Sequence, residues 1–175
     1  MIFTEERKSM DEKVLVAYGS KRGSTAEIAE RIGETIRQKG WLADVADTST
    51  VNDLTPYCRV ILGSSVYIGL WHRNVVRFIK KNIETLEKLP VWLFISGPTG
   101  PGDPMEQMDG WLYPKSLQPF IQRLNPKTIT CFGGKLVIST LNPLEKWIVK
   151  KVKSPEGDFR NWKDIELWAE AVCAD

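Results

Sequence analysis

The chain has 175 residues, of which 42% are hydrophobic and 26% charged, and its formal net charge is +2. This length suits one well-buried domain and is short for two, and so small a net charge does not indicate a nucleic-acid-binding protein. Three widely spaced cysteines without a CxxC pair argue against a disulfide framework or a metal site, and they favour a reducing, cytoplasmic location.

Apolar segments and helical patterns alternate along the chain. Residues 1–12 mix charges of both signs and lack the apolar stretch of a signal peptide, so we expect a flexible lead followed by a single domain over residues 13–175. Strands are expected at Val14–Tyr18, Leu42–Ala46, Val60–Gly63, Val91–Ile95 and Thr128–Phe132, and helices near residues 24–40, 73–82 (or to 86), 117–124, 144–153 and 161–172. Strands that are apolar on both faces indicate an α/β fold, a doubly wound five-stranded parallel sheet with helices on both faces.

The turn between the first strand and the first helix is rich in glycine and hydroxyl side chains. Gly23 allows a tight turn, and the hydroxyls lie beside the free N–H groups of a helix N-terminus, which favours an anion. The spacing fits neither a Walker loop nor a dinucleotide fingerprint, so a single phosphate is the expected ligand. The candidate phosphate-binding residues are Ser20, Lys21, Arg22, Gly23, Ser24 and Thr25. The alternatives are that Ser24 or Thr25 merely caps the helix, and that Lys21 and Arg22 point into solvent.

Two further loops are expected at the same edge of the sheet, after the third and the fourth strand. Doubly wound sheets bind ligands at the carboxyl ends of their strands, where the strand order reverses. The first loop carries two aromatic rings, Tyr67 and Trp71, which either stack on a flat ligand or pack on the protein, and the second is rich in Gly and Pro. The candidate ring-binding residues are Ser64, Ser65, Val66, Tyr67, Ile68, Gly69, Trp71, Ser96, Gly97, Pro98, Thr99 and Gly100. A plain surface excursion is the alternative for the second loop.

The turn over residues 20–25 resembles the hydroxyl-rich phosphate loop of flavodoxins. The loops that begin at Ser64 and Ser96 fall where that family holds the isoalloxazine ring of FMN, at the switch point of the sheet. The resemblance covers about residues 13–173. It implies a flavodoxin-like sheet of strand order 2-1-3-4-5, non-covalently bound FMN and electron transfer.

A narrower resemblance, to flavodoxin-like protoporphyrinogen oxidases, rests on residues 63–80, 144–152 and 158–169. It implies an FMN-dependent oxidoreductase that dehydrogenates a porphyrinogen and passes electrons to a quinone. The alternatives are an electron carrier that acts with a redox protein partner and has no substrate of its own, and a flavin-free binding module. The slightly basic chain departs from strongly acidic shuttle flavodoxins, whereas the acidic residues in the loop over 99–115 depart from the oxidases.

No catalytic side chain is expected, because the flavin would supply the redox chemistry. His72 is expected to be a polar residue at a helix start, with proton transfer as the alternative. Residues 144–153 form a basic amphipathic pattern in a segment that is longer than the fold needs. Such a helix can make peripheral contact with an anionic membrane or with an acidic partner, or it can pack on the domain with its lysines in water. No apolar run is long enough to span a bilayer.

Overall fold

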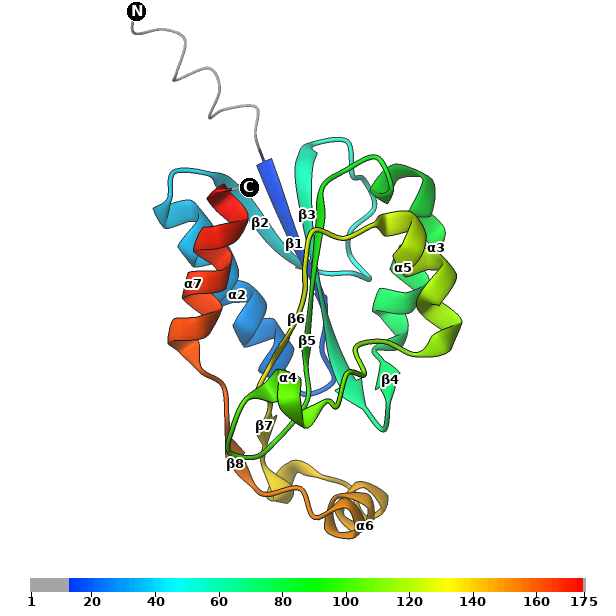
Figure 1. Cartoon of the computed structure of the whole chain (residues 1–175), viewed down its shortest axis with the longest axis vertical. Coiled ribbons are helices and arrows are strands. Elements are labelled where there is room, and N and C mark those ends of the chain that lie inside the picture. The colour runs from blue at the N-terminus through cyan, green and yellow to red at the C-terminus, as the bar shows by residue number, and fades with distance from the viewer. Residues whose placement is uncertain (1–12, 175) are drawn as a thin grey trace, which may run out of the picture.

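The computed structural model describes residues 13–174, which form a parallel sheet with helices on both faces (Figure 1). The parallel strands are β1 (Lys13–Gly19), β2 (Leu42–Asp47), β3 (Tyr57–Tyr67), β5 (Val91–Ser96) and β6 (Ile129–Phe132). Their order is β2-β1-β3-β5-β6, which confirms the predicted doubly wound arrangement. The predicted lead over residues 1–12 lies outside the described residues.

Two apolar layers hold the helices on the sheet. Helices α2 (Ser24–Gln38) and α7 (Trp162–Ala174) cover one face, and α3 (Arg73–Leu86) and α5 (Gln118–Leu124) cover the other (Figure 1). In β1, Val14 and Val16 pack toward α2 and α7, whereas Leu15 and Ala17 pack toward α3 and α5. Side chains alternate between faces along a strand, so a continuously apolar strand is the pattern of a sheet that is buried on both sides.

The third strand is longer than predicted, which corrects the description of residues 64–72 as a loop. β3 continues to Tyr67 and pairs antiparallel with a sixth, two-residue strand of the same sheet, β4 (Leu70–Trp71). Ile68 and Gly69 connect the strands with φ values of 51° and 66°. Positive φ at both positions is typical of a two-residue turn whose twist matches an antiparallel pair. The segment is therefore a hairpin at the carboxyl edge of the sheet.

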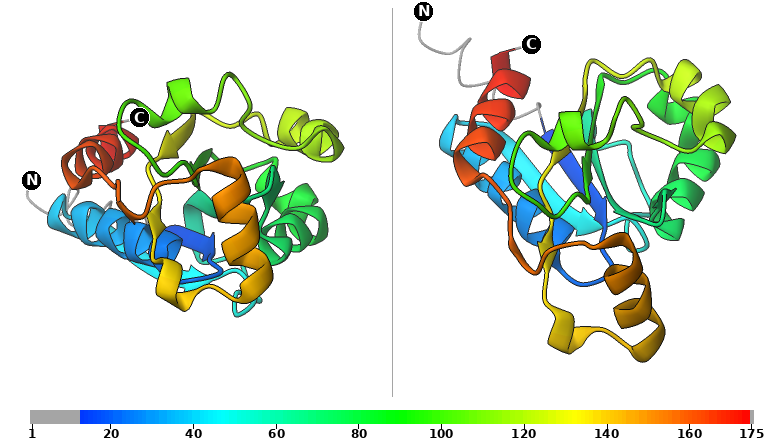
Figure 2. Two further views of the ribbon diagram at one scale, coloured as in Figure 1. Left: turned by 90° about the horizontal axis from the view of Figure 1, so that it is seen from below. Right: turned by 60° about the horizontal axis from the view of Figure 1, so that its bottom comes forward.

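After β6 the chain leaves the sheet before it returns as α7, and we call residues 133–161 the excursion. It contains β7 (Lys135–Leu136), the 3₁₀ turn η2 (Ile138–Thr140), α6 (Pro143–Val152) and β8 (Gly157–Asp158), and β7 pairs antiparallel with β8. The predicted helix over residues 144–153 is thus confirmed as α6. Figure 2 shows α6 lying across the carboxyl end of the sheet.

Short helical turns complete the described part of the chain: α4 (Pro104–Gln107), which follows the Gly- and Pro-rich loop after β5, and η1 (Lys115–Leu117), which leads into α5. Asp103 caps α4 by accepting hydrogen bonds from the backbone N–H groups of Met105 and Glu106. Among residues 13–174, each helix is too short or too polar to cross a bilayer.

Candidate functional site

The carboxyl ends of β1, β3 and β5 open into a cavity of about 260 Å³. An adjoining hollow of about 450 Å³ shares part of its wall, and together they reach the size range of small-molecule pockets. Most of the predicted site residues line the cavity: Ser20, Lys21, Arg22, Ser24, Thr25, Ser65, Val66, Tyr67, Ile68, Ser96, Gly97 and Thr99. The structure therefore brings the three predicted segments together at one place.

The N-terminus of α2 forms the polar end of the cavity. The alternative that Ser24 or Thr25 caps this helix is wrong, because the N-cap residue is Gly23, at φ 85° and ψ −17°, and no side chain caps the helix. The first intrahelical bond runs from Glu27 N to Gly23 O (2.9 Å), so the N–H groups before it point out of the helix end. The hydroxyl of Ser20 accepts a hydrogen bond from Gly23 N (2.9 Å) and braces the turn. An uncapped helix N-terminus favours an anion.

Two buried hydroxyl groups at the cavity have no hydrogen-bond partner within the described part of the chain. They are Ser24 Oγ and Tyr67 Oη, and both residues line the cavity. A buried polar atom without a partner costs about 1–3 kcal/mol, and such atoms are rare in native proteins. A ligand with acceptor oxygens, such as a phosphate beside Ser24, would satisfy them. The donor set at this end therefore fits a phosphate group.

The rest of the cavity lining is largely apolar. Gly97 lies so close to β3 that an added Cβ would be 3.1 Å from Val66 Cβ, and a Cβ on Gly134 would be 3.0 Å from Gly97 O. Glycine at both positions allows the backbones to approach one another, and larger apolar side chains such as Leu136 and Ile148 complete this part of the lining. A lining of this kind suits a flat ring system, which backbone N–H and C=O groups could bind at its edge. The residues present therefore fit FMN, whose phosphate would lie at the start of α2 and whose ring would lie against the apolar lining.

Several predicted residues lie outside the cavity. The largest correction is Trp71, which is only 5% exposed, packs in the core and donates from Nε1 to Leu112 O (2.9 Å). Ser64 is fully buried, and its Oγ accepts from His72 N (2.9 Å). Gly69 and Pro98 line only the adjoining hollow. Gly100 contacts the amide side chain of Gln107.

His72 stands at the start of α3, as predicted. It is the N-cap residue, and its Nδ1 accepts a hydrogen bond from Asn74 N (3.4 Å). Because the ring is engaged at the helix end and lies outside the lining of the cavity, the structural role agrees with the geometry.

The excursion supplies a second wall of the cavity, which the sequence did not predict. Its lining residues are Gly134, Lys135, Leu136, Leu141, Ile148, Val149, Val152 and Ser154. The signal available in the sequence was the extra length after the fifth strand, together with the apolar spacing of Ile148 and Val152 on one side of a helix. That spacing alone does not identify the surface against which the helix packs.

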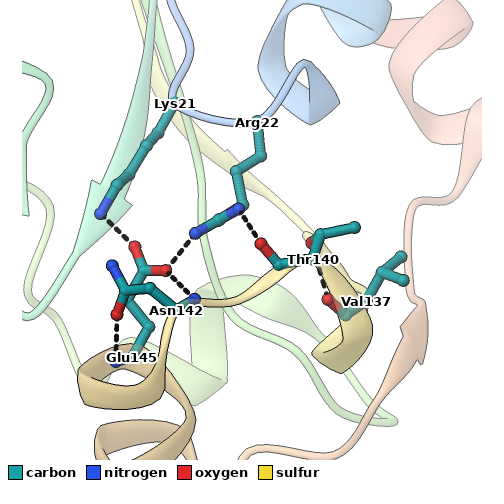
Figure 3. Close-up of polar contacts among 6 residues, drawn as sticks. All are labelled: Lys21, Arg22, Val137, Thr140, Asn142 and Glu145. Atoms are coloured by element: carbon teal, nitrogen blue, oxygen red, sulfur yellow. Dashed lines mark hydrogen bonds and ion pairs between the residues drawn. The ribbon is translucent and has the colours of Figure 1, made fainter.

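A buried carboxylate joins the excursion to the turn over residues 20–25, which we call the phosphate-type turn (Figure 3). Glu145 of α6 is 4% exposed and pairs with Lys21 Nζ (2.6 Å) and with the guanidinium of Arg22. Arg22 also donates to Thr140 O (2.7 Å), and Lys21 Nζ lies 4.3 Å from the centre of the Tyr67 ring. Both cations are therefore paired with Glu145, and both side chains also remain partly exposed to solvent.

Local structure holds Glu145 in this position. Its backbone N–H donates to Asn142 Oδ1 (2.8 Å) and its side chain accepts from Asn142 N (2.9 Å), which forms a capping box at the start of α6. Hydrogen bonds from Lys21 and from Asn142 N, together with the charges of Lys21 and Arg22, hold the pKa of Glu145 below its ordinary value, against the opposing effect of burial. The carboxylate is therefore charged at neutral pH and links α6 to the turn.

A doubly wound sheet with a cavity at the carboxyl ends of its strands, beside an uncapped helix N-terminus, places this chain among the doubly wound α/β domains. The flavodoxin domain family model matches residues 15–162, and the chain belongs to this family. The match spans both the sheet and the excursion. It agrees with the resemblance that the phosphate-type turn indicated.

Comparisons with individual proteins support the same family. The chain is 30% identical over 80 residues to protoporphyrinogen IX dehydrogenase (quinone) of Escherichia coli strain K12, a match that covers 45% of this chain and 44% of that protein. The chain thus aligns with less than half the length of the curated relatives that it matches.

Solved structures show the fold. A flavodoxin from the domain Archaea has a TM-score of 0.56 at 19% identity, covering 81% of this chain and 99% of that one. Oxidised flavodoxin 2 from Bacillus cereus has a TM-score of 0.60 at 18% identity, covering 93% of this chain and 98% of that one. These likenesses extend over nearly the whole of both flavodoxins.

Proposed function

We propose that this protein binds FMN non-covalently in the cavity and transfers electrons through it. The observation that carries the proposal is the pair of buried, unpartnered hydroxyls, Ser24 Oγ and Tyr67 Oη, at a cavity that begins at an uncapped helix N-terminus. Membership of the flavodoxin domain family supports it. When bound, FMN would supply reversible electron acceptance.

The protein's own residues would bind and orient the cofactor. The N–H groups at the start of α2 and the hydroxyl of Ser24 would hold the phosphate. Residues 65–68 and 96–99 would enclose the ring, and α6 would exclude water from the far side of the cavity through Ile148 and Val149. Exclusion of water strengthens the hydrogen bonds that hold the flavin.

The first test compares two buried, unpartnered hydroxyls, one at the cavity and one away from it. Ser24→Ala is expected to leave the stability of the flavin-free protein unchanged or to raise it, because it removes an unpartnered hydroxyl. It should weaken FMN binding about tenfold or more, because a hydrogen bond to a charged phosphate is lost. Binding is measured by quenching of flavin fluorescence, and stability by urea unfolding.

Thr48 provides the matched control. Its Oγ1 is also buried without a partner within residues 13–174, but Thr48 lines a different hollow, beside α3. Like Ser24→Ala, Thr48→Val should therefore leave the free energy of unfolding unchanged or raise it. Unlike Ser24→Ala, it should leave FMN affinity unchanged. Full FMN affinity in Ser24→Ala would remove Ser24 from the phosphate site.

For the reaction, we propose dehydrogenation of a porphyrinogen-type substrate with a quinone as electron acceptor. The partial match to the Escherichia coli dehydrogenase supports this, and so does the basic surface of α6, which is unlike that of an acidic electron shuttle. Each pair of hydrogens removed from the porphyrinogen would reduce one quinone to the quinol. The alternative is a flavodoxin-type carrier that exchanges electrons with a redox protein and has no substrate of its own.

An anaerobic assay separates these two functions. Protein reconstituted with FMN is incubated with protoporphyrinogen, with and without a menaquinone analogue. We expect fluorescent porphyrin to appear only when the quinone is present. An absence of turnover, together with rapid electron exchange with an iron–sulfur protein, would instead identify an electron carrier.

A further inference from the structure

The outer face of α6 is not covered by the rest of the described chain. On the inner face, Glu145 and Val149 are buried, and Ile148 lines the cavity. On the outer face, Leu144 is 66% exposed and Trp147 is 58% exposed. Large apolar side chains of this kind, side by side on one helix, mark a contact surface more often than a solvated one.

The charges on the same surface have one sign. The lysines of residues 144–153 are all exposed: Lys146, Lys150, Lys151 and Lys153. The acidic side chain of α6, Glu145, is buried and neutralised by Lys21 and Arg22. Lys151 Nζ lies 4.9 Å from the centre of the Trp147 ring, so cationic and aromatic groups are interleaved. The surface is therefore both apolar and cationic.

The tip of the β3–β4 hairpin also exposes large apolar side chains beside the cavity. Ile68 is 63% exposed and Leu70 is 62% exposed. Ile68 lines the cavity, as does the exposed residue Val152 at the end of α6, so both are solvent-exposed parts of its lining. Figure 1 places α6 and this hairpin beyond the same end of the sheet.

We propose that the outer face of α6 and the hairpin tip dock on an anionic lipid surface, with the mouth of the cavity turned toward the lipid. A helix with Trp and Leu on one side and lysines around them is the pattern of an interfacial membrane helix, in which the apolar side chains enter the headgroup region and the lysines contact anionic lipids. This inference goes beyond the proposed redox function and holds whichever ligand occupies the cavity.

Two other occupants fit this surface less well. A second copy of the chain would bring two clusters of lysines together, which opposes association. An acidic protein would match the lysines, but the apolar tip formed by Ile68 and Leu70 carries no charge for it to match. A lipid surface accommodates both features.

The test uses the full-length protein and sedimented vesicles, either of phosphatidylcholine alone or of phosphatidylcholine mixed with phosphatidylglycerol. We expect binding to the mixed vesicles, little binding to neutral ones, and release by added salt. Lys146→Gln/Lys150→Gln/Lys153→Gln should weaken binding about a hundredfold, since each lysine near an anionic surface contributes roughly a fivefold gain. A blue shift of tryptophan emission that disappears in Trp147→Phe would show insertion of that ring.

Two further variants make the result specific. Lys81→Gln/Lys88→Gln/Lys127→Gln removes three exposed lysines elsewhere and should bind like the wild type. Leu70→Ser tests the orientation, because Leu70 is exposed and lies outside the cavity lining, and it should weaken binding. Circular dichroism and thermal melting establish that each variant is folded.

Four results would overturn the inference: equal binding to neutral and anionic vesicles, no binding to either, equal losses in the two lysine variants, or wild-type binding by Leu70→Ser. Capture of an acidic protein without vesicle binding would assign the surface to a protein partner instead.

Discussion

Replacing Gly23 by valine is expected to weaken FMN binding at least a hundredfold. Gly23 is the N-cap residue of α2 at φ 85°, and an added Cβ would meet no atom within 4 Å. The obstacle is therefore backbone conformation, because a β-branched residue strongly disfavours positive φ. A return to negative φ would turn the N–H groups at the helix start away from the phosphate. The loss of about two charge-assisted hydrogen bonds accounts for the hundredfold change.

Gly40 gives a control at the other end of the same helix. It has φ 90°, no atom within 4 Å of an added Cβ, and a place just after the last turn of α2. Gly40→Val should therefore lower the free energy of unfolding about as much as Gly23→Val does. It should leave FMN affinity unchanged. Flavin fluorescence titrations and urea unfolding of both variants give the comparison. If Gly23→Val lost stability but still bound FMN normally, the phosphate would have to lie elsewhere.

The fold and the first wall of the site were predictable because their signals are local. Val14–Tyr18 and Val91–Ile95 are apolar at every position, which only a sheet covered on both faces requires. The turn around Gly23 combines glycine and hydroxyl residues directly before a helix, and this combination has few structural uses. Parallel pairing places the carboxyl ends of the strands at one edge of the sheet, and the flavodoxin resemblance implied the strand order, so these segments were expected to meet there.

Trp71 shows where local signals were insufficient. In the sequence it is an aromatic residue in a stretch that also contains small residues. An aromatic side chain in such a stretch can stack on a ligand or pack in the core. The outcome depended on the hairpin, because its register pairs Val66 with Trp71 and directs the indole into the core. That register depends on a turn at Ile68, a β-branched residue at positive φ, which sequence preferences do not favour.

The second wall was unpredictable for a different reason. The ion pair between Lys21 and Glu145 joins residues 124 positions apart. In the sequence, Glu145 is one acidic residue beside several lysines, and the ordinary interpretation is a solvated charge that supports the start of a helix. It does form that capping box with Asn142, but the same carboxylate also pairs with Lys21 and Arg22. Only the folded structure shows that the two roles coincide.

Glu145→Gln is therefore expected to release the excursion from the phosphate-type turn. The side chain of Glu145 is 5% exposed and pairs with two cations, and glutamine removes the charge while keeping the size. We expect amide hydrogen exchange in α6 to become about tenfold faster, because the loss of one partly buried ion pair makes local opening of the helix easier. FMN should dissociate faster as well, because α6 forms the far wall of the cavity.

Glu166→Gln is the matched control for this variant. Glu166 pairs with Arg31 Nη1 at 2.6 Å and joins α7 to α2, outside the cavity lining. It should change neither exchange in α6 nor the rate of FMN dissociation. Faster FMN dissociation in both variants would indicate a general loss of stability rather than release of the excursion.

The effect of Glu145→Gln on the free energy of unfolding should also depend on pH in a defined direction. Hydrogen bonds from Lys21 and Asn142 N lower the pKa of Glu145 below its ordinary value of 4.5. A carboxyl group with a lowered pKa stabilises the folded state fully above its ordinary pKa, and this contribution disappears as the pH falls through the lowered one. Below that pH the protonated side chain resembles glutamine. The difference in the free energy of unfolding between wild type and variant, measured by urea unfolding, should therefore be largest at neutral pH and smallest in acid. A difference that grew on acidification would exclude a charged Glu145 as the link.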